Sequence, residues 1–330
     1  MKPFYSLTEA GQTKRLRKLA FKALQQYNLN VKRLNLITKD THTIFRVDTE
    51  IGEKFALRIY SEGETSLEDN QVEMFFLNQI STHTDLPVPE PVTAKNGELI
   101  TFAQVPDVPE ERRCVLFRWV PGHCLEDELS TKYYFQLGQQ MARLHDFAKT
   151  IQIPSHLDPR QWDQVFYYRD EPVVLHDESY SALFTPQRLE VIEKAMSMAD
   201  NLFNQLYART EGKILIHADL HFWNVHVYRG KIYLLDFEDA LLGYPLQDIA
   251  VTLSYGRTLP EHPDLCAAFK EGYSSQNIWP VETQCQLETL WMARSIMFIN
   301  YVAHTKALEP EPYINDRCAD LKKFLDRCGS

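Results

Sequence analysis

The sequence predicts an α+β fold with a small antiparallel sheet near the N-terminus and a mainly helical remainder. Two observations predict it. Short β-rich runs are concentrated in the N-terminal third, at 32–37, 42–48, 54–60, 98–102 and 114–120. Beyond Pro121-Gly122, apolar residues recur mostly at helical spacing. We therefore expect one domain over 1–120 and a second over 121–330, divided at this Pro-Gly pair.

Helical periodicity is expected on both sides of this boundary, over 8–27, 66–82, 131–148 and 186–208. Glu73 lies at the edge of the apolar side of the second of these helices. A carboxylate near an apolar stripe needs a partner. Arg58 is the natural candidate, because it projects from the face of its strand opposite the packed one. An exposed Glu73 without a partner is the alternative.

The composition is that of an ordinary globular protein. The chain has 330 residues, 44% of them hydrophobic and 24% charged, and a formal net charge of −10. An acidic chain is poorly suited to non-specific nucleic-acid binding. Six cysteines form no C-x-x-C pair and suggest no disulfide framework. No stretch has the pattern of a signal peptide or the length of a membrane span, so we expect no membrane partner and a cytoplasmic location.

A predicted β-hairpin organises the C-terminal part. Two β-rich runs, 224–228 and 231–235, are separated only by Arg229-Gly230, a strong signal for a tight turn. If pairing starts at the two residues that flank this turn, the register brings Asn224 beside Asp236 at the open end of the hairpin. Cross-strand neighbours have Cβ atoms about 5 Å apart, so the two side chains could reach one ion.

Three oxygen-bearing side chains belong to this end of the hairpin. Asp219 lies five residues before Asn224, in the loop that leads into the first strand, and Asp236 follows the second strand. Carboxylate and amide oxygens, completed by water and substrate phosphates, are the usual ligands of Mg²⁺. The hairpin end is therefore suited to a hard cation.

These residues occur in an order that resembles a known catalytic signature. His217-Ala218-Asp219-Leu220 with Asn224, followed by Asp236-Phe237-Glu238, resembles the kinase motifs H-x-D-L-x-x-x-N and D-F-G. Ala218 in place of Arg, and Glu238-Asp239 in place of Gly, match the aminoglycoside phosphotransferase-like family better than protein kinases. That family also contains choline, homoserine, methylthioribose and fructosamine kinases. The resemblance implies a bilobal protein kinase-like fold and ATP-dependent phosphorylation of a small-molecule hydroxyl.

The resemblance also implies a role for each residue of the site. Asp219 would accept the proton or hydrogen bond of the acceptor hydroxyl, and Asn224 and Asp236 would hold Mg²⁺ on the β- and γ-phosphates of ATP. Arg58 stands where kinase-like folds carry a lysine, and it would clamp the phosphate tail with Glu73 as its ion-pair partner.

Three further roles concern the hinge and the support of the catalytic loop. By the same resemblance, Phe117, Arg118 and Trp119 would occupy the hinge position beside adenine, although interlobe packing is the alternative for Trp119. Asp248 is expected to accept hydrogen bonds from backbone N–H groups of the catalytic loop. His145 is expected to be a structural histidine with both nitrogens bonded.

Two other functions fit parts of the pattern. A metal-dependent hydrolase would use His217, Asp219, His221 and His226, although a spacing of four aligns ligands only on a helix. A non-catalytic nucleotide-binding regulator of the same fold is favoured by the glycine-free turn at 37–42 and by Arg58. The presence of Asp219, Asn224 and Asp236 favours catalysis.

The acceptor is expected to be a small hydroxylated molecule, such as an amino alcohol, a sugar, an amino acid or an aminoglycoside. The short interval between Asp236 and Asp248 leaves no room for the activation loop of a protein kinase. The aromatic, irregular segment 153–184 is suited either to acceptor binding or to packing over helices. The sequence sets neither the acceptor nor the oligomeric state.

Overall fold

The structure is a computed structural model that describes residues 2–329. The chain divides into two compact units. Unit 1 consists of Met1–Asp127, Ile153–Asp158 and Val225–Glu238, and unit 2 consists of Glu128–Gln152, Pro159–Asn224 and Asp239–Ser330. Unit 1 therefore includes a hairpin that lies far from the rest of it in the sequence.

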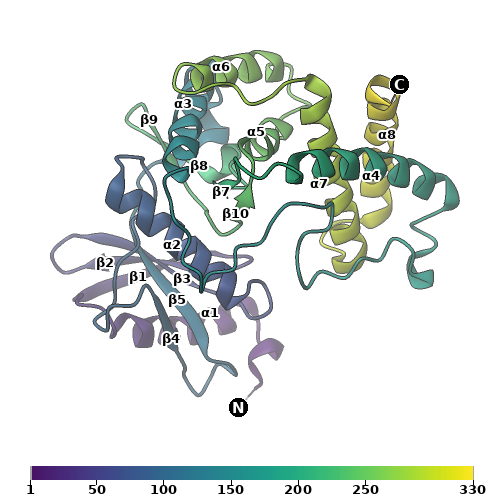
Figure 1. Cartoon of the computed structure of the whole chain (residues 1–330). Helices are drawn as coiled ribbons and strands as arrows, with labels where there is room; N and C mark the ends of the chain where they lie inside the picture. Colours follow the sequence, from purple (N-terminus) through teal and green to yellow (C-terminus); the bar gives the residue numbers. More distant parts are fainter. Residues whose placement is uncertain (1, 330) are drawn as a thin grey trace. The chain divides into compact units, whose positions relative to one another are not determined.

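Unit 1 is built on a five-stranded antiparallel sheet with the strand order β1-β2-β3-β5-β4 (Figure 1). The strands are β1 (Val31–Lys39), β2 (Thr43–Thr49), β3 (Lys54–Ile59), β4 (Ile100–Ala103) and β5 (Arg112–Arg118). The β-rich runs expected from alternation coincide with these strands. A short turn, η1 (Phe4–Ser6), precedes the first helix.

Two helices accompany this sheet, α1 (Glu9–Leu24) and α2 (Leu67–His83). The apolar stripe of α1 shares one buried core with residues of the strands, including Leu19 with Phe45 and Leu57. Helix α2 begins at an N-cap, Ser66, whose side chain accepts a hydrogen bond from the Asp69 backbone N–H. The expected helices over 8–27 and 66–82 are thus confirmed.

The predicted hairpin forms in unit 1 with the predicted register. Strand β8 (Val225–Tyr228) pairs with β9 (Lys231–Leu234), and the two residues that flank the turn face each other. The turn residues Arg229 and Gly230 both have positive φ, as a two-residue hairpin requires. A third strand, β6 (His123–Cys124), pairs with β8 and was not anticipated, because two residues are too short to show a period.

Unit 2 is mainly helical, with a two-stranded sheet formed by β7 (Ile214–Ile216) and β10 (Leu241–Gly243). The helices are α3 (Thr131–Ala148), α4 (Pro186–Tyr207), α5 (Pro245–Ser254), α6 (His262–Ser274), α7 (Gln284–Thr305) and α8 (Pro310–Cys328). Helices α3 and α4 confirm the helices expected over 131–148 and 186–208. The short 3-10 turns are η2 (Leu125–Glu128), η3 (Glu178–Tyr180) and η4 (Phe222–Asn224).

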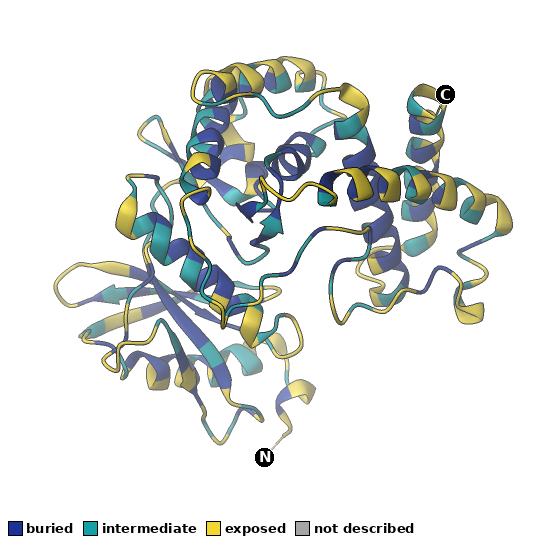
Figure 2. Cartoon of the chain, in the orientation of Figure 1, coloured by how far each residue is buried: buried dark blue, intermediate teal, exposed yellow. Residues whose placement is uncertain are grey.

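Helices α3 and α6 of unit 2 are in close contact at Gly138. A Cβ atom at Gly138 of α3 would lie 2.1 Å from the carbonyl oxygen of Phe269 in α6, so only glycine lets the two helices meet there. Helices α5 and α7 are dark blue over most of their length in Figure 2, whereas α4 and α8 also carry exposed residues. The core of this unit therefore surrounds α5 and α7.

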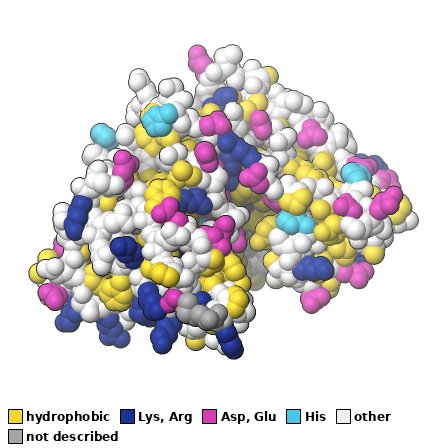
Figure 3. Space-filling view, turned by 90° about the horizontal axis from the view of Figure 1, so that it is seen from below, with side chains coloured by type: hydrophobic (Ala, Val, Ile, Leu, Met, Phe, Trp, Pro, Cys, Tyr) yellow, Lys and Arg dark blue, Asp and Glu magenta, His cyan; other side chains and the backbone are white. Residues whose placement is uncertain are grey.

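Charged side chains are distributed over the surface. Both signs are interspersed with hydrophobic side chains on the face drawn in Figure 3. Basic residues of α1 are bonded within unit 1, since Arg15 donates to the carbonyl oxygen of Asp107 and Lys18 pairs with its carboxylate. Within residues 2–329, no helix is long and apolar enough to cross a membrane.

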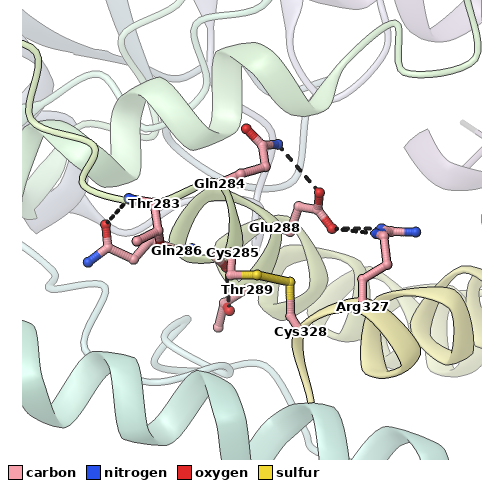
Figure 4. Close-up of a disulfide and its surroundings, with 8 residues drawn as sticks. All are labelled: Thr283, Gln284, Cys285, Gln286, Glu288, Thr289, Arg327 and Cys328. Carbon is pink, nitrogen blue, oxygen red and sulfur yellow. Dashed lines mark hydrogen bonds and ion pairs between the residues drawn. A yellow bond between two sulfur atoms is a disulfide. The ribbon is translucent and has the colours of Figure 1, made fainter. Parts of the chain in front are cut away.

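A disulfide joins Cys285, at the start of α7, to Cys328, at the end of α8 (Figure 4). The sequence-based expectation of no disulfide is therefore wrong. The two cysteines are separated by 43 residues, and only the antiparallel packing of the two helices brings them together. Arg327 and Glu288 form an ion pair of 2.6 Å beside the disulfide. The predicted cytoplasmic location stays a prediction.

We predict that the denatured protein has four reactive thiols before reduction and six afterwards, because the remaining cysteines are Cys114, Cys124, Cys266 and Cys318. The Cys328→Ser variant should lose about 2–4 kcal/mol in the free energy of unfolding, the usual effect of opening such a loop. Reductant should destabilise the wild type and leave this variant unchanged. Six thiols without reductant would contradict the disulfide.

Candidate active site

In unit 1, Arg58 of β3 is surrounded by three carboxylates. Its Nη1 donates to Glu73 Oε1 at 2.8 Å and to Glu238 Oε2 at 3.2 Å, and its Nη2 donates to Asp236 Oδ1 at 3.2 Å. Glu73 has no exposed surface, and its second oxygen accepts a hydrogen bond from the Tyr60 hydroxyl at 2.7 Å. The expected Arg58–Glu73 ion pair is confirmed, and the alternative of an exposed Glu73 is wrong.

The electrostatics of this cluster keep Arg58 charged. Burial disfavours the charged form, but Glu73, Asp236 and Glu238 outweigh it and raise the pKa of Arg58 well above its usual value. For Glu73, burial also disfavours the charged form and therefore raises the pKa, whereas the nearby Arg58 lowers it. The guanidinium also lies over the ring of Phe117, 5.5 Å from its centroid. Arg58 is therefore a fixed positive charge next to Asp236.

Glu238 is joined to the turn between β1 and β2. The Nδ1 atom of His42 accepts a hydrogen bond from the Ser61 backbone N–H, so Nε2 carries the proton and donates to Glu238 Oε1 at 2.7 Å. The sequence reasoning assigned no role to His42. In the structure, the carboxylate of Glu238 links His42 to Arg58.

In unit 2, Asp248 of α5 supports the catalytic loop. Its carboxylate accepts hydrogen bonds from the backbone N–H groups of His217 at 3.1 Å and Ala218 at 2.9 Å. His145 Nε2 donates to the same carboxylate at 3.0 Å, and its Nδ1 lies 2.9 Å from the Tyr273 hydroxyl. Both sequence predictions are confirmed: Asp248 holds the loop backbone, and His145 has both nitrogens bonded.

The backbone of Ala218 has φ of 63°, in the left-handed region that non-glycine residues rarely adopt. This conformation aims two successive N–H groups at Asp248. Asp236 also has a positive φ, of 61°. Such conformations cost free energy and persist only where the surroundings fix them. Tertiary contacts therefore hold the backbone of Ala218, which precedes Asp219, and that of Asp236 itself.

Asp219 is bonded on both carboxylate oxygens. Asn224 Nδ2 donates to Oδ2 at 3.0 Å, and Arg294 Nη2 of α7 donates to Oδ1. His221 Nε2 lies 3.3 Å from Oδ2. Burial would raise the pKa of Asp219, but Arg294 and His221 outweigh it and lower the pKa below its usual value. The carboxylate is therefore ionised at neutral pH.

No role was predicted for Arg294 from the sequence. This residue lies 75 residues after Asp219, inside the apolar run 290–298. The one available signal was a charged residue in an otherwise apolar helix, because such a residue must find a partner. Its Nη1 also donates to the carbonyl oxygen of Ala218 at 3.3 Å.

The orientation of the Asn224 amide suits a metal ligand. Its Nδ2 donates to the carbonyl oxygen of Asp219 at 2.9 Å and to the Asp219 carboxylate, and both of these groups can only accept. The Oδ1 atom therefore points the other way, and within residues 2–329 no donor bonds to it. In unit 1, the Asp236 side chain is 48% exposed and bonds Arg58 through one oxygen only. Both side chains thus offer an oxygen of the type that Mg²⁺ binds.

The aromatic segment 153–184 is bonded to Asp239 and packs against α4. Tyr168 donates to Asp239 Oδ1 at 2.8 Å, and Arg160 Nη2 lies 3.4 Å from the same oxygen. Burial, followed by the nearby Asp219, raises the pKa of Asp239. Trp162 of the same segment is buried against Phe203 of α4. The packing alternative therefore applies to Trp162, and acceptor binding by this segment stays a prediction.

The expected hinge residues lie in and after β5. Phe117 is buried, and Arg118 is exposed beside Glu90. The backbone N–H of Arg118 donates to the Glu90 carbonyl oxygen, and that of Trp119 donates to Lys54. Contact with adenine through these two N–H groups would require both bonds to be exchanged. The role of these three residues stays a prediction.

The histidines do not form a metal centre. In the described part of the chain, no three or more His, Cys, Asp and Glu side chains are arranged to hold a metal ion. His217 Nδ1 accepts from the Asp219 backbone N–H, and His221 Nδ1 accepts from that of Trp223. This geometry gives the hydrolase alternative no support.

The antiparallel sheet with a buried Arg–Glu pair, and the loop with Asp219 and Asn224 ahead of a hairpin that ends at Asp236, define a kinase-like phosphotransferase. Residues 36–283 match the sequence model of the family described as the phosphotransferase enzyme family, APH. The match covers most of the chain, and the chain belongs to this family.

Individual relatives are distant in sequence. The chain is 26% identical to the uncharacterized protein sll1119 of Synechocystis sp., over 86% of this chain and 76% of that protein. It is 24% identical to the amicoumacin kinase of Bacillus subtilis, over 54% of this chain and 50% of the kinase.

Solved structures share the fold over nearly the whole chain. A microcompartment-associated aminopropanol kinase aligns with a TM-score of 0.77 at 21% identity, over 95% of this chain and 98% of that one. An amicoumacin kinase in complex with AMP-PNP and Ca²⁺ aligns with a TM-score of 0.76 at 17% identity, over 96% of each chain. The predicted α+β, kinase-like fold is confirmed, and family membership places the protein among small-molecule phosphotransferases.

Proposed function

We propose that the protein transfers the γ-phosphoryl group of ATP to a hydroxyl group of a small molecule, with Asp219 as the base. The observation that carries the proposal is the geometry of the catalytic loop. Asn224 is tied to Asp219 through its amide nitrogen, which leaves its amide oxygen open for a cation. One side chain thus orients the base and offers a metal ligand.

Asn224 and Asp236 are the proposed ligands of Mg²⁺. Asn224 directly precedes β8, Asp236 closely follows β9, and the pairing of Val225 with Leu234 supports this proposal. The neighbour that holds AMP-PNP together with Ca²⁺ supports a nucleotide with a divalent cation. When bound, Mg²⁺ neutralises charge on the β- and γ-phosphates.

Asp219 orients the acceptor hydroxyl and receives its proton. Its pKa is lowered mainly by Arg294, so it is a weak base that is always available in the ionised form. Phosphoryl transfer passes through a loose transition state that asks for little early proton removal, so position matters more than basicity. The hydrogen bonds from Arg294 and Asn224 fix that position.

Arg58 is proposed to hold the phosphate tail of ATP. Its guanidinium is already fixed by Glu73, whose buried carboxylate accepts hydrogen bonds from Arg58 and from the Tyr60 hydroxyl. A fixed fork of donors suits bidentate binding of phosphate oxygens. Phe117, Arg118 and Trp119 are proposed to lie beside adenine.

The transfer reaction is tested by ADP release with Mg²⁺, ATP and a panel of amino alcohols, sugars and aminoglycosides. We predict that Asp236→Ala weakens Mg²⁺-dependent ATP binding by a hundredfold or more, beyond the roughly 10–100-fold typical of residues that only support metal ligands. Mg²⁺ titrations of ATP affinity measure this change.

The matched control is Glu64→Ala, which removes an exposed carboxylate of unit 1 and should leave ATP affinity unchanged. Unaltered Mg²⁺ dependence in Asp236→Ala would remove Asp236 from the metal site. ATP binding without turnover on any acceptor would favour the regulator of the same fold.

A further inference from the structure

A cavity of about 760 Å³ lies within unit 2, bordered by the loop after α5 and by helices α7 and α8. This volume is in the range of small-molecule sites. Aromatic side chains form much of its wall, namely Trp223, Tyr255, Trp291, Phe298 and Tyr313. Such a wall is suited to the flat or apolar body of a ligand.

The charge of this cavity is opposite to that of the chain. Among its lining residues five are basic, whereas Asp320 is the one acidic residue. The whole chain carries a formal net charge of −10. The basic residues are Arg257, Arg294, Arg317, Lys323 and Arg327. These five cations outnumber the three acids that pair with them, Asp219, Glu288 and Asp320, so this part of an acidic protein attracts anions and repels cations.

Arg257 is the basic residue available to a ligand. Arg294 is bonded to Asp219, Arg327 to Glu288, and both Arg317 and Lys323 to Asp320. By contrast, the contacts of residues 2–329 include no hydrogen bond or ion pair of Arg257, whose guanidinium lies over the Trp291 ring at 5.4 Å.

The surroundings of Arg257 favour an anion. Burial lowers the pKa of Arg257 and the positive charge of Arg317 adds to this effect, whereas Asp320 and Glu288 oppose it. Arg257 is half-buried, and an anionic ligand would supply the ion-pair partner that the contacts of residues 2–329 do not give it. The stacked Trp291 ring holds the planar guanidinium in place while leaving its edge available for a bidentate contact.

The same cavity reaches the catalytic loop. Arg294 lines it and donates to Asp219. Tyr255 lines it and stacks on His221, with ring centroids 4.0 Å apart, and His221 lies 3.3 Å from Asp219. Trp223, another lining residue, belongs to the loop itself. Part of the cavity wall is therefore formed by residues that contact the proposed base or belong to its loop.

We propose that this cavity is the acceptor site and that the acceptor is an alcohol carrying an anionic group, a carboxylate or a phosphate, which binds Arg257. The inference rests on the proposed kinase function. The acceptor oxygen forms a bond to the γ-phosphorus while the bond from that phosphorus to the leaving oxygen of ADP breaks, and the hydroxyl proton passes to Asp219.

This assignment distinguishes the protein from its relatives. The similar structures include an aminopropanol kinase and aminoglycoside phosphotransferases. An amino group is cationic at neutral pH and would meet the charges of Arg257 and Arg317. Specificity is a difference between two affinities, so repulsion of a wrong ligand contributes to it in the same way as a favourable contact with the right one.

A matched series of four alcohols tests the inference. The probes are 4-(hydroxymethyl)benzoate, 4-(hydroxymethyl)phenyl phosphate, 4-(hydroxymethyl)benzamide and 4-(aminomethyl)benzyl alcohol, which share ring and hydroxyl and differ in charge. Binding without ATP is measured by tryptophan fluorescence, because Trp223 and Trp291 line the cavity. At least one of the two anionic probes should bind about tenfold or more tighter than the amide, and the amine weakest.

The preferred anionic probe identifies the group as carboxylate or phosphate. In Arg257→Gln, its affinity should fall roughly tenfold to a hundredfold, and that of the amide should stay unchanged. The control Arg209→Gln removes an exposed arginine of unit 2, paired with Glu282 outside the cavity, and should change neither. Equal binding of all four probes by the wild type would overturn the inference even if the variant failed to fold.

The acceptor site and the kinase function can fail separately. ADP release with cationic or neutral acceptors, while neither anionic probe binds, would overturn the anionic acceptor and leave the kinase intact. Anion binding that depends on Arg257, with no ADP release from any alcohol, would keep the binding site and overturn the proposed reaction.

Discussion

Replacement of Asp219 by asparagine is expected to lower the rate of phosphoryl transfer by about 10²- to 10⁴-fold, the range for loss of a positioned general base. Asparagine keeps the size and the contact with Asn224, but it cannot accept the hydroxyl proton. ATP affinity should stay near that of the wild type, because Asp219 contacts the acceptor and not the phosphates in the proposed mechanism. Turnover and ATP binding are measured separately.

The control for this substitution is Asp200→Asn, which changes an exposed carboxylate on α4 and should leave turnover unaffected. Circular dichroism checks that the loss of the Arg294 partner does not unfold unit 2. Full transfer activity in Asp219→Asn would show that another group takes the proton, and the assignment of the base would be wrong.

Replacement of Asp248 by alanine is expected to have the largest effect on stability, about 3–5 kcal/mol in the free energy of unfolding. The carboxylate is fully buried and accepts from two backbone N–H groups and from His145. Its removal leaves all three donors buried without a partner. Because the same bonds hold Ala218 in its left-handed conformation, turnover should fall as well. Urea unfolding and ADP release measure the two effects.

The pH dependence of unfolding gives a second check on Asp248. Burial would raise its pKa, but His145 outweighs it and lowers the pKa below the ordinary 3.8. The resulting stability is present above the pKa of the unfolded carboxyl and is lost as the pH falls through the folded value. Asp248→Ala should lack this acid-induced loss. Asp146→Ala, which removes an exposed carboxylate of α3, should cost at most about 1 kcal/mol.

Local sequence signals were sufficient for the hairpin and for several partners. The pairing of β8 with β9 was predictable because Arg229-Gly230 sets the turn and the turn sets the register. The Arg58–Glu73 pair was predictable because alternation aims Arg58 away from the packed face and an apolar helix side demands a partner for Glu73. Ranges such as α3 followed from strong helical periodicity.

Short elements and distant contacts were beyond such signals. Strands β6 and β10 contain too few residues to show a period. The Cys285–Cys328 disulfide depends on how α7 and α8 pack, and no spacing rule connects residues at opposite ends of a helical hairpin. Likewise, His42 reaches Glu238 across 196 residues of sequence.

The sequence alone determined the order of the chemical groups, a carboxylate, an amide and a second carboxylate close to one hairpin, which is enough to recognise a phosphotransferase. Only the tertiary structure decided which charges meet. Arg294 is bonded to Asp219, whereas the guanidinium of Arg257 lies over the ring of Trp291. The physical reason is that secondary structure follows from neighbours within a few residues, while a long side chain finds its partner only after helices far apart in the sequence have packed.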